Sequence, residues 1–357
     1  MKYIIITGSS GLVGSETVSF FHQKGFKVIG IDNNLRKYFF GKIACTNWKK
    51  NFQIRNLKNF NYNNIDIRNY NKLEKLFLKY KSKIKCIIHA AAQPSHDWAV
   101  KEPNTDFTVN AFSTLNLLEL TKKYCPKAVF IFVSTNKVYG DTPNRLQFNE
   151  KSTRFEIKKN SKFYNGVDET MSIDQSTHSL FGVSKSYADL ITQEYGRNFG
   201  LNTGIFRLGC ITGGSHSGAE LHGFLSYLVR VNLKKIPYVI YGYKGKQVRD
   251  NIHALDLVKC FWEFYKKPKK GEVYNIGGGR ENSCSILEAI HIIEEKTKIK
   301  FNFKVIKKNR VGDHIWYISN NKKFKKDYKN WKVKISLSSI IDDIKNNNVN
   351  FKYSPKC

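Results

Sequence analysis

The opening of the chain combines a short apolar run with a glycine-rich turn. Residues 3–6 read Tyr-Ile-Ile-Ile, and Gly8, Gly11 and Gly14 follow at intervals of three. In such a unit the first glycine permits a tight turn, the second lets the backbone approach a pyrophosphate, and the third allows a helix to pack closely on the strand. The N–H groups at the start of that helix face the phosphates. The pattern therefore predicts a strand, a phosphate-binding turn and a helix.

The next residues complete a βαβ unit. We expect a helix over residues 15–24 and a second strand over 27–31, which ends in Asp32, 18 residues past Gly14. A carboxylate at this place accepts hydrogen bonds from both hydroxyls of an adenosine ribose. It also repels a 2′-phosphate, which favours NAD over NADP. Arg36 lies nearby in the sequence, so NADP is not excluded. The alternative is an ordinary βαβ unit without a ligand.

Further cofactor contacts are expected where later strands end, because ligands of doubly wound sheets lie beyond the carboxyl ends of the strands. Strands are predicted to end near residue 65, at His89 and at residue 133. The alanines after His89 would let a flat cofactor lie against the backbone. The predicted cofactor-binding residues are Gly8, Ser10, Gly11, Leu12, Val13, Gly14, Asp32, Asn33, Asp66, Ile67, Ala90, Ala91, Ala92, Asn110 and Lys185.

Two of these residues have alternative interpretations. Asp66 follows the predicted third strand, where it could accept a hydrogen bond from the adenine amino group or cap the helix expected over residues 69–80. Asn110 lies in a helix expected over residues 105–124. Its side chain either tethers backbone near the cofactor or lies on the helix surface. Spacing alone does not separate these possibilities.

Strand and helix patterns alternate through residues 1–207, which is typical of an α/β fold. We predict a Rossmann-type doubly wound parallel sheet there, with further helix over 180–199 and strand over 203–207. Residues 33–64 are expected to be loops with a short helix. Residues 208–357 predict a smaller mixed α/β substrate domain, in which segments around 237–258 cross back to the first domain. A helix is expected over 224–233 and a strand near 238–241, and the polar last twenty residues are expected to fray.

The composition is strongly basic, with 60 Lys and Arg against 29 Asp and Glu and a net charge of +31. The excess lysine is spread along the whole chain with abundant Asn, Ile, Phe and Tyr, residues that share AT-rich codons. We therefore attribute it to compositional drift and predict no nucleic-acid partner. A basic surface would still steer an anionic nucleotide toward the protein.

Other classes of protein are disfavoured as well. The apolar runs are far too short for a membrane span, and the first residues lack the pattern of a signal peptide. Seven cysteines are scattered without metal-type spacing. We predict no metal site and a reducing, cytoplasmic compartment.

The motifs, taken in order, resemble the extended short-chain dehydrogenase/reductases of the NAD-dependent epimerase/dehydratase family, which act on nucleotide sugars. Beyond the glycine turn, Asp32 and the segment His89-Ala-Ala-Ala, the resemblance rests on residues 134–140, 182–185, 245–250, 275–278 and 310–313. Within the family, residues 134–141, 168–170 and the long insert at 141–179, with Thr-Arg-Phe at 153–155, are most similar to CDP-paratose (CDP-tyvelose) 2-epimerases. The resemblance spans nearly the whole chain.

This resemblance implies an epimerase that oxidises a sugar carbinol with tightly held NAD and then returns the hydride to the opposite face. Ser134 or Thr135 would bind the reacting hydroxyl, and Lys185 would bind the nicotinamide ribose. Dehydratases of the family carry an Asp-Glu pair after this Ser-Thr, where this chain has Asn136 and Lys137, neither of them a credible acid–base pair. Dehydration is therefore disfavoured.

The resemblance also implies a substrate site and a homodimer. Arginines suit a diphosphate because the guanidinium fork donates two parallel hydrogen bonds. The predicted substrate-binding residues are Gln93, Asn136, Arg207, His216, Arg249 and Arg310, and a loop over residues 215–222 is expected to cover the sugar. Relatives dimerise through the helices that correspond to residues 105–124 and 180–199.

One residue departs from the family pattern. The catalytic tyrosine that precedes the lysine by four residues is Phe181 here, and a phenyl ring exchanges no proton. Proton transfer by a positioned base contributes about 10²–10⁴-fold to rate. Candidate substitutes are His178, Tyr164, His96 and Asp97. The alternatives to an epimerase are an NAD-binding sensor or scaffold that lost its base, and a reductase that releases NADH.

Overall fold

The computed structural model describes residues 2–219, 222–310 and 312–350. Glu220 and Leu221 of the predicted sugar loop, Val311 of the last family motif and residues 351–357 of the predicted frayed end lie outside these ranges.

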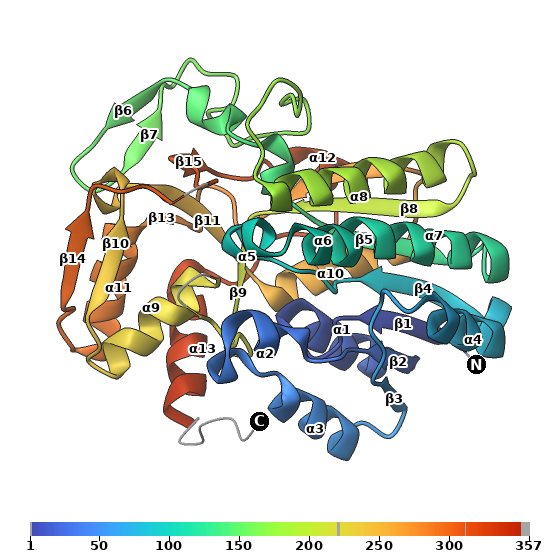
Figure 1. Ribbon diagram of the computed structural model, residues 1–357. Helices are drawn as coiled ribbons and strands as arrows, with labels where there is room; N and C mark the ends of the chain where they lie inside the picture. Colours follow the sequence, from blue (N-terminus) through green and yellow to red (C-terminus); the bar gives the residue numbers. More distant parts are fainter. Residues whose placement is uncertain (1, 220–221, 311, 351–357) are drawn as a thin grey trace.

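The described residues contain a parallel sheet of seven strands in the order β12-β8-β5-β4-β1-β2-β3 (Figure 1). The strand order reverses next to β1, which pairs with β2 on one side and β4 on the other. A crevice for a ligand forms at such a reversal, beyond the carboxyl ends of the strands. The strands are β1 (Tyr3–Thr7), β2 (Lys27–Ile31), β3 (Phe60–Asn63), β4 (Ile84–His89), β5 (Val129–Thr135), β8 (Asn202–Leu208) and β12 (Glu272–Ile276).

Helices cover both faces of this sheet. One face packs against α1 (Leu12–Gln23), α10 (Ala254–Lys266) and α12 (Lys322–Asp327), and the other against α4 (Tyr70–Tyr80), α7 (Ser113–Tyr124) and α8 (Leu180–Arg197). Strands buried on both faces are expected to be continuously apolar, as the run Ile4, Ile5, Ile6 is, with all three side chains fully buried. The predicted Rossmann-type doubly wound sheet is confirmed.

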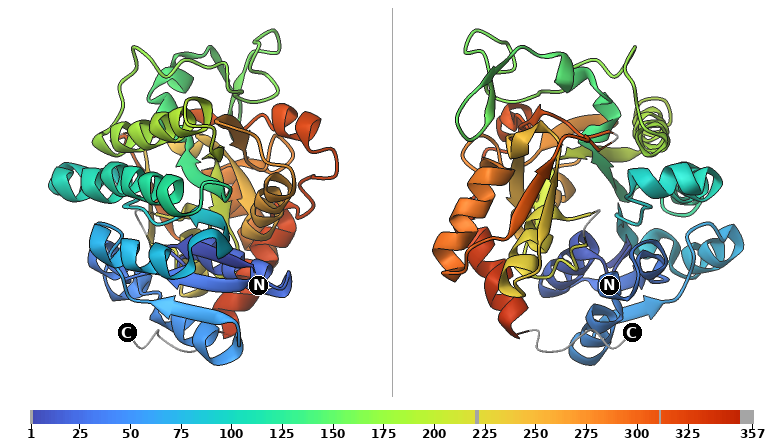
Figure 2. Two further views of the ribbon diagram at one scale, coloured as in Figure 1. Left: turned by 90° about the vertical axis from the view of Figure 1, so that its right-hand side faces the viewer. Right: turned by 60° about the vertical axis from the view of Figure 1, so that its left-hand side comes forward.

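A second, smaller lobe lies beside the sheet (Figure 2). It holds the parallel pair β10 (Tyr238–Tyr241) and β14 (Phe303–Ile306), and a mixed sheet in which β11 (Val248–His253) pairs with β9 (Cys210–Thr212), β13 (Ser283–Ser285) and β15 (Trp316–Tyr317). Its helices are α9 (Phe224–Leu233), α11 (Ile286–Thr297) and α13 (Leu337–Asn350). After β11 the chain returns to the large sheet as α10 and β12, so residue 207 is not the last residue of that sheet.

Several elements differ from the sequence expectations. Residues 33–64 contain two helices, α2 (Leu35–Phe40) and α3 (Asn47–Asn56), besides β3. The single helix expected over 105–124 consists of α6 (Pro103–Phe107), a π-helical turn at Thr108–Phe112, and α7. The insert carries a hairpin of β6 (Phe148–Glu150) and β7 (Phe155–Ile157), and α5 (His96–Lys101) follows β4.

The expectation that the last twenty residues fray is wrong for the part that the structure describes. Residues 337–350 form α13, and Ile340, Ile341 and Ile344 are buried against α9 and α11. An apolar stripe of this spacing stabilises a helix by packing, even in a Lys- and Asn-rich sequence.

Candidate active site

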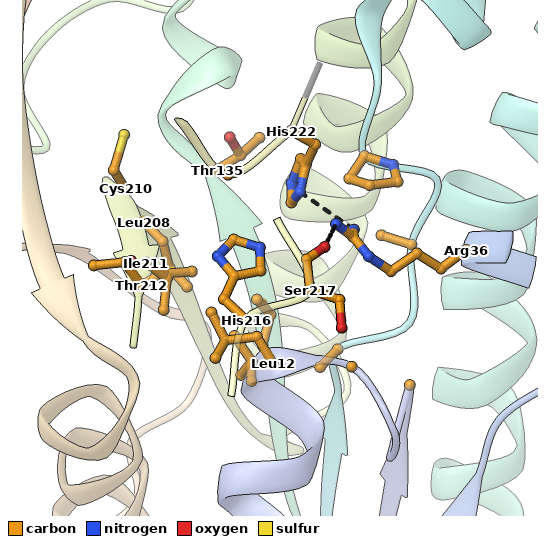
Figure 3. Close-up of a pocket in the computed structure, with 18 of the residues that line it drawn as sticks. Leu12, Arg36, Thr135, Leu208, Cys210, Ile211, Thr212, His216, Ser217 and His222 are labelled. Carbon is orange, nitrogen blue, oxygen red and sulfur yellow. Dashed lines mark hydrogen bonds between the residues drawn. The ribbon is translucent and has the colours of Figure 1, made fainter. Parts of the chain in front are cut away.

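A cavity of about 480 Å³ lies between the two lobes, beyond the carboxyl ends of β1, β2, β4 and β5 (Figure 3). It brings together every predicted cofactor-binding residue except Asn110. From the second lobe it is lined by β9, β10 and β11, including the predicted substrate residue Arg249, and by Arg310. A single cavity therefore joins a nucleotide cradle to residues of the substrate lobe.

The glycine turn leaves no room for side chains. Gly8 has φ +67°, and a Cβ there would lie 2.9 Å from the backbone of Ala91. A Cβ on Gly14 would lie 2.0 Å from the carbonyl oxygen of Gly8. The hydroxyl of Ser10 is buried and has no hydrogen-bond partner in the described residues. A bare backbone turn with a spare donor at a helix N-terminus fits the pyrophosphate of a dinucleotide.

Asp32 lies at the end of β2, where its two carboxylate oxygens accept hydrogen bonds from Ser10 N (2.9 Å) and Asn34 N (2.7 Å). Burial raises the pKa of this carboxyl group. Asp66 lies close by and accepts from the Asn33 side chain at 3.2 Å. The alternative in which Asp66 caps the next helix is wrong, because Asn69 accepts the hydrogen bond from Lys72 N and so caps α4.

Asn110 is buried and does not lie on a helix surface. Its Oδ1 accepts from Gln93 N at 2.9 Å, and its Nδ2 donates to Gln93 O at 3.0 Å. The side chain therefore holds the backbone directly after Ala90, Ala91 and Ala92, which line the cavity.

The residues after β5 have unequal access to the cavity. Ser134 and Thr135 both line it, but Ser134 Oγ donates to Asp189 Oδ2 at 2.6 Å. Lys185 on α8 is buried, and its Nζ donates to Val133 O at 2.8 Å. Burial lowers the pKa of Lys185 to about 7. Thr135 Oγ1 accepts from Lys137 N at 3.2 Å and donates to Asn136 Oδ1 at 3.5 Å, so both of its hydrogen bonds are longer than that of Ser134.

Phe181 lines the cavity, with its ring centroid 5.2 Å from that of His96. His96 Nδ1 lies 2.5 Å from Ser179 Oγ, the residue that caps α8. Of the predicted substitutes for the tyrosine, His96 thus lies beside Phe181, which occupies the tyrosine position. Asp97 is exposed and pairs with Arg310 at 3.5 Å.

Two predicted catalytic residues need correction, because neither lines the cavity. The ring nitrogens of His178 lie 2.9 Å from Ser176 O and 2.7 Å from Val138 O, so the loop backbone occupies both. The ring of Tyr164 lies under the Arg280 guanidinium at 4.2 Å, in the packed base of the insert.

Three predicted substrate-binding residues are also corrected, since they are buried outside the cavity wall. Gln93 donates to Asp106 and to Ser95 O, both at 2.8 Å. Arg207 forms a two-pronged ion pair with Asp189, at 2.8 and 3.0 Å. Asn136 turns into the packed interior after β5 and accepts a long contact from Thr135.

The remaining predicted substrate residues, Arg249, Arg310 and His216, do line the cavity. Arg249 is buried and pairs with Asp313, and it donates to Val248 O at 2.7 Å. His216 is buried with Nδ1 unpartnered among the described residues. Unpartnered buried polar atoms in a cavity wall are positioned for a ligand.

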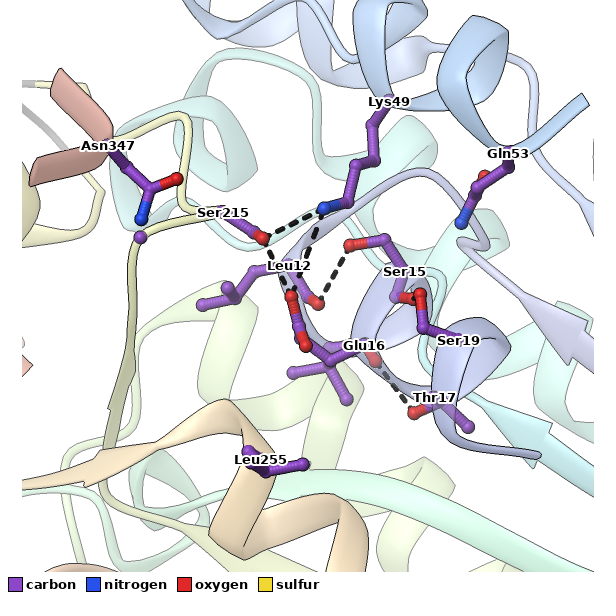
Figure 4. A network of polar contacts seen from close by, with 12 residues as sticks. Leu12, Ser15, Glu16, Thr17, Ser19, Lys49, Gln53, Ser215, Leu255 and Asn347 are labelled. Atoms are coloured by element: carbon purple, nitrogen blue, oxygen red, sulfur yellow. Dashed lines mark hydrogen bonds and ion pairs between the residues drawn. The ribbon is translucent and has the colours of Figure 1, made fainter. Parts of the chain in front are cut away.

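A loop between β9 and α9 covers one side of the cavity, and sequence spacing did not reveal what holds it. Arg36 of α2 donates to Ser217 O at 2.9 Å and contacts His222 Nδ1 at 3.2 Å (Figure 3). Lys49 of α3 donates to Ser215 Oγ at 2.9 Å, and Ser215 donates to Glu16 Oε1 at 2.7 Å (Figure 4). The helices between β2 and β3 thus fix the substrate loop to the nucleotide-binding lobe.

Lys137, which the sequence dismissed as an acid–base group, lies in the cavity wall. Its Nζ donates to Gly312 O at 2.9 Å. Burial and the nearby Arg249 lower its pKa to about 8. Its charge state is therefore set by the cavity rather than by solvent.

Residues 4–277 match the NAD dependent epimerase/dehydratase family, and the chain belongs to that family. The protein is thus an NAD-dependent enzyme of nucleotide-sugar metabolism.

The chain is also similar to individual relatives of known sequence and structure. The chain is 34% identical over 307 residues to CDP-paratose 2-epimerase of Salmonella typhi, covering 84% of this chain and 86% of the relative. It is 28% identical over 350 residues to a putative UDP-glucose 4-epimerase of Methanocaldococcus jannaschii, covering 97% and 99%. In fold it is similar to UDP-glucuronic acid 4-epimerase from Bacillus cereus in complex with UDP-glucuronic acid and NAD, with a TM-score of 0.78, 22% identity and coverage of 98% and 99%.

Two features are absent from residues 2–219, 222–310 and 312–350. No helix there has the length and apolar character needed to cross a membrane. No group of three His, Cys, Asp or Glu side chains in the same residues is arranged to hold a metal ion.

Proposed function

We propose that this protein is a nucleotide-sugar epimerase that oxidises one sugar carbinol carbon and reduces it again from the other face. One observation carries the choice of epimerisation over dehydration: among the described residues, the carboxylates that line the cavity are Asp32, Asp66 and Asp313. Asp32 and Asp66 lie at the end of the cavity where the adenosine of NAD would bind, and Asp313 pairs with Arg249. Loss of water by the Asp-Glu pair of the dehydratases needs a free carboxyl group beside the sugar, and the described cavity wall offers none.

We further propose that the substrate is a CDP-linked deoxysugar that is epimerised at C2. The support is the 34% identity to CDP-paratose 2-epimerase over most of both chains. Arg249 and Arg310, which line the cavity from the second lobe, would bind the diphosphate.

The cradle fits NAD, because the glycine turn excludes side chains and Asp32 faces the end of the cavity that a ribose would enter. When bound, NAD supplies the hydride acceptor and donor. Gly8, Ser10 and Gly11 would hold the pyrophosphate, and Lys185 would orient the nicotinamide ribose. Since the hydride is returned to the same sugar, the cofactor is not consumed.

We also propose that the protein is a homodimer. Leu180, Val183, Tyr187 and Leu190 are exposed by 37–51% and recur along one side of α8. Phe107 of α6 extends this apolar stripe, with its ring 5.9 Å from that of Tyr187. An apolar face of this kind on paired helices fits a second copy of the same face.

Incubation with CDP-, GDP- and UDP-sugars in deuterated buffer tests the proposal. Return of the same hydride predicts an epimer without carbon-bound deuterium, detected by NMR. Deuterium at a sugar carbon would instead indicate proton abstraction from carbon. Accumulation of NADH at 340 nm would identify a reductase. Bound NAD without turnover of any nucleotide sugar would contradict an epimerase and favour the sensor alternative.

A further inference from the structure

With Phe181 at the position of the tyrosine, the reacting hydroxyl needs another proton acceptor. Most ionisable groups in the cavity wall either form an ion pair or have a pKa unsuited to accepting this proton. Asp313 pairs with Arg249. Burial raises the pKa of the Cys210 thiol to about 11, which keeps it protonated, and lowers the pKa of His96 to about 3, which makes it a weak acceptor.

The amine of Lys137 is held by two acceptors. Its Nζ donates to Gly312 O at 2.9 Å and lies 3.5 Å from His314 Nδ1. The other ring nitrogen of His314, Nε2, lies 2.8 Å from Gly140 O. Because a carbonyl oxygen only accepts, Nε2 carries the ring proton and Nδ1 is left as an acceptor for Lys137. Two of the three tetrahedral positions on Nζ therefore point at protein acceptors.

These two contacts leave one tetrahedral position on Nζ without an acceptor among the described residues, and Lys137 lines the cavity. In the ammonium form this position holds an N–H donor. In the neutral amine it holds the lone pair, while the same two N–H groups still donate to Gly312 O and His314 Nδ1. The geometry thus accommodates both protonation states without rearrangement.

We propose that Lys137, rather than a tyrosine, accepts and returns the proton of the reacting sugar hydroxyl. The proposal rests on the epimerase function proposed above. As the O–H bond breaks, its proton binds the Nζ lone pair and the oxygen electrons form the C=O bond. The carbon-bound hydrogen leaves with its electron pair as hydride, which bound NAD would accept. In the return step hydride adds to the other face of the carbonyl and Nζ gives its proton back to the oxygen.

Charged groups on several elements set the proton affinity of this amine. Arg249 of β11 and Arg310 lower it, and Asp313 and the Cys210 thiol raise it. Asp313 gives its ion pair to Arg249 rather than to Lys137. With burial, the balance gives a pKa of about 8, which suits proton transfer in both directions near neutral pH.

Three substitutions of Lys137 separate proton transfer from charge. Lys137→Met removes the amine, and Lys137→Arg keeps a cation and its donors but cannot lose a proton at working pH. We expect Lys137→Met and Lys137→Arg to lower kcat by about 10²–10⁴-fold and to change KM by no more than a few-fold. In Lys137→Ala, added ethylamine should restore part of kcat. Lys122→Met, at a surface ion pair, is the matched control and should leave kcat unchanged.

Retained turnover in Lys137→Arg would overturn the role of Lys137 alone. Loss of kcat in His96→Asn together with full kcat in Lys137→Met would assign the proton to His96 instead. Failure of the unmodified protein to convert any nucleotide sugar would overturn the proposed function itself.

A second measurement does not depend on turnover. Competitive acetylation with acetic anhydride over a pH series, read by peptide mass spectrometry, reports the midpoint of each lysine. We expect a midpoint near 8 for Lys137. A midpoint for Lys137 near 10.5, the ordinary value, would overturn the proposal whatever the activity.

Discussion

Ser134 Oγ donates a hydrogen bond to Asp189 Oδ2 at 2.6 Å, from the end of β5 to the middle of α8. Asp189 also receives the guanidinium fork of Arg207 from β8. The serine that family resemblance assigned to substrate is therefore part of an internal polar cluster. Thr135, one residue further, lines the cavity as well, and its hydrogen bonds are longer.

This cluster predicts a large loss of stability on removal of Asp189. The carboxylate and Arg207 are almost completely buried, so Asp189→Ala leaves a buried guanidinium without its counter-charge. Such a loss costs about 3–5 kcal/mol. Urea denaturation measures it, and Lys244→Met, which breaks an exposed pair with Glu150, should cost about 1 kcal/mol or less. Equal effects of the two substitutions would contradict the prediction.

Periodic segments could be predicted from the sequence, because their packing follows directly from residue pattern. The strands over 27–31 and 238–241 and the helix over 224–233 have the predicted bounds. The nucleotide half of the site was predictable too, since a glycine turn and a strand-end carboxylate have fixed places in a doubly wound sheet.

The substrate half was less predictable, because a polar residue near a strand end faces either the cavity or the interior. Arg207 and Gln93 turn inward to buried carboxylates, and spacing carries no sign of this. Contacts between distant segments, such as that of Arg36 with Ser217, could not be predicted from the sequence either. Lys137 was dismissed on residue type, since only burial brings a lysine pKa near neutrality.

Gly14→Ala should disrupt the nucleotide cradle. Its Cβ would meet Gly8 O at 2.0 Å, and both partners are backbone, so the turn must move. We expect a loss of about 3 kcal/mol and purified protein without bound NAD. The control is Gly11→Ala, whose Cβ would lie 3.3 Å from the same oxygen and needs only a small shift for folding. Thermal denaturation should separate the two, and equal stability would contradict the crowding argument.

Arg36→Met should loosen the loop over the cavity. The substitution removes the donors to Ser217 O and His222. A hydrogen bond to a charged donor contributes about 1.5–3 kcal/mol, so amide exchange at Gly218 and Ala219 should accelerate about tenfold or more. Hydrogen–deuterium exchange measures this, with Lys37→Met on the same helix as control. Unchanged exchange in Arg36→Met would show that the loop is held by other contacts.

Lys185 should make stability depend on pH in a defined direction. Its pKa is about 7 in the folded protein against an ordinary 10.5, so between these values the unfolded chain binds more protons. Stability must then rise with pH across this window, by up to about 1.4 kcal/mol per pH unit, and the penalty is complete below pH 7. Comparison of denaturation curves for the unmodified protein and Lys185→Met, both without cofactor, isolates this slope. The contributions of the other titratable groups to the pH dependence are the same in both proteins and cancel. Parallel pH profiles would contradict burial of the ammonium.

Val183→Glu should convert the proposed dimer into monomers. Val183 is 51% exposed at the centre of the apolar stripe on α8, between Leu180 and Tyr187. Two-fold symmetry would bring this surface against its own copy, so one substitution places two carboxylates in an apolar contact. Light scattering after gel filtration should then give 41.3 kDa rather than twice that mass. Val305→Glu, at an exposed apolar position on β14, should leave the dimer intact. A monomeric unmodified protein, or a dimeric Val183→Glu variant, would rule out this face as the interface.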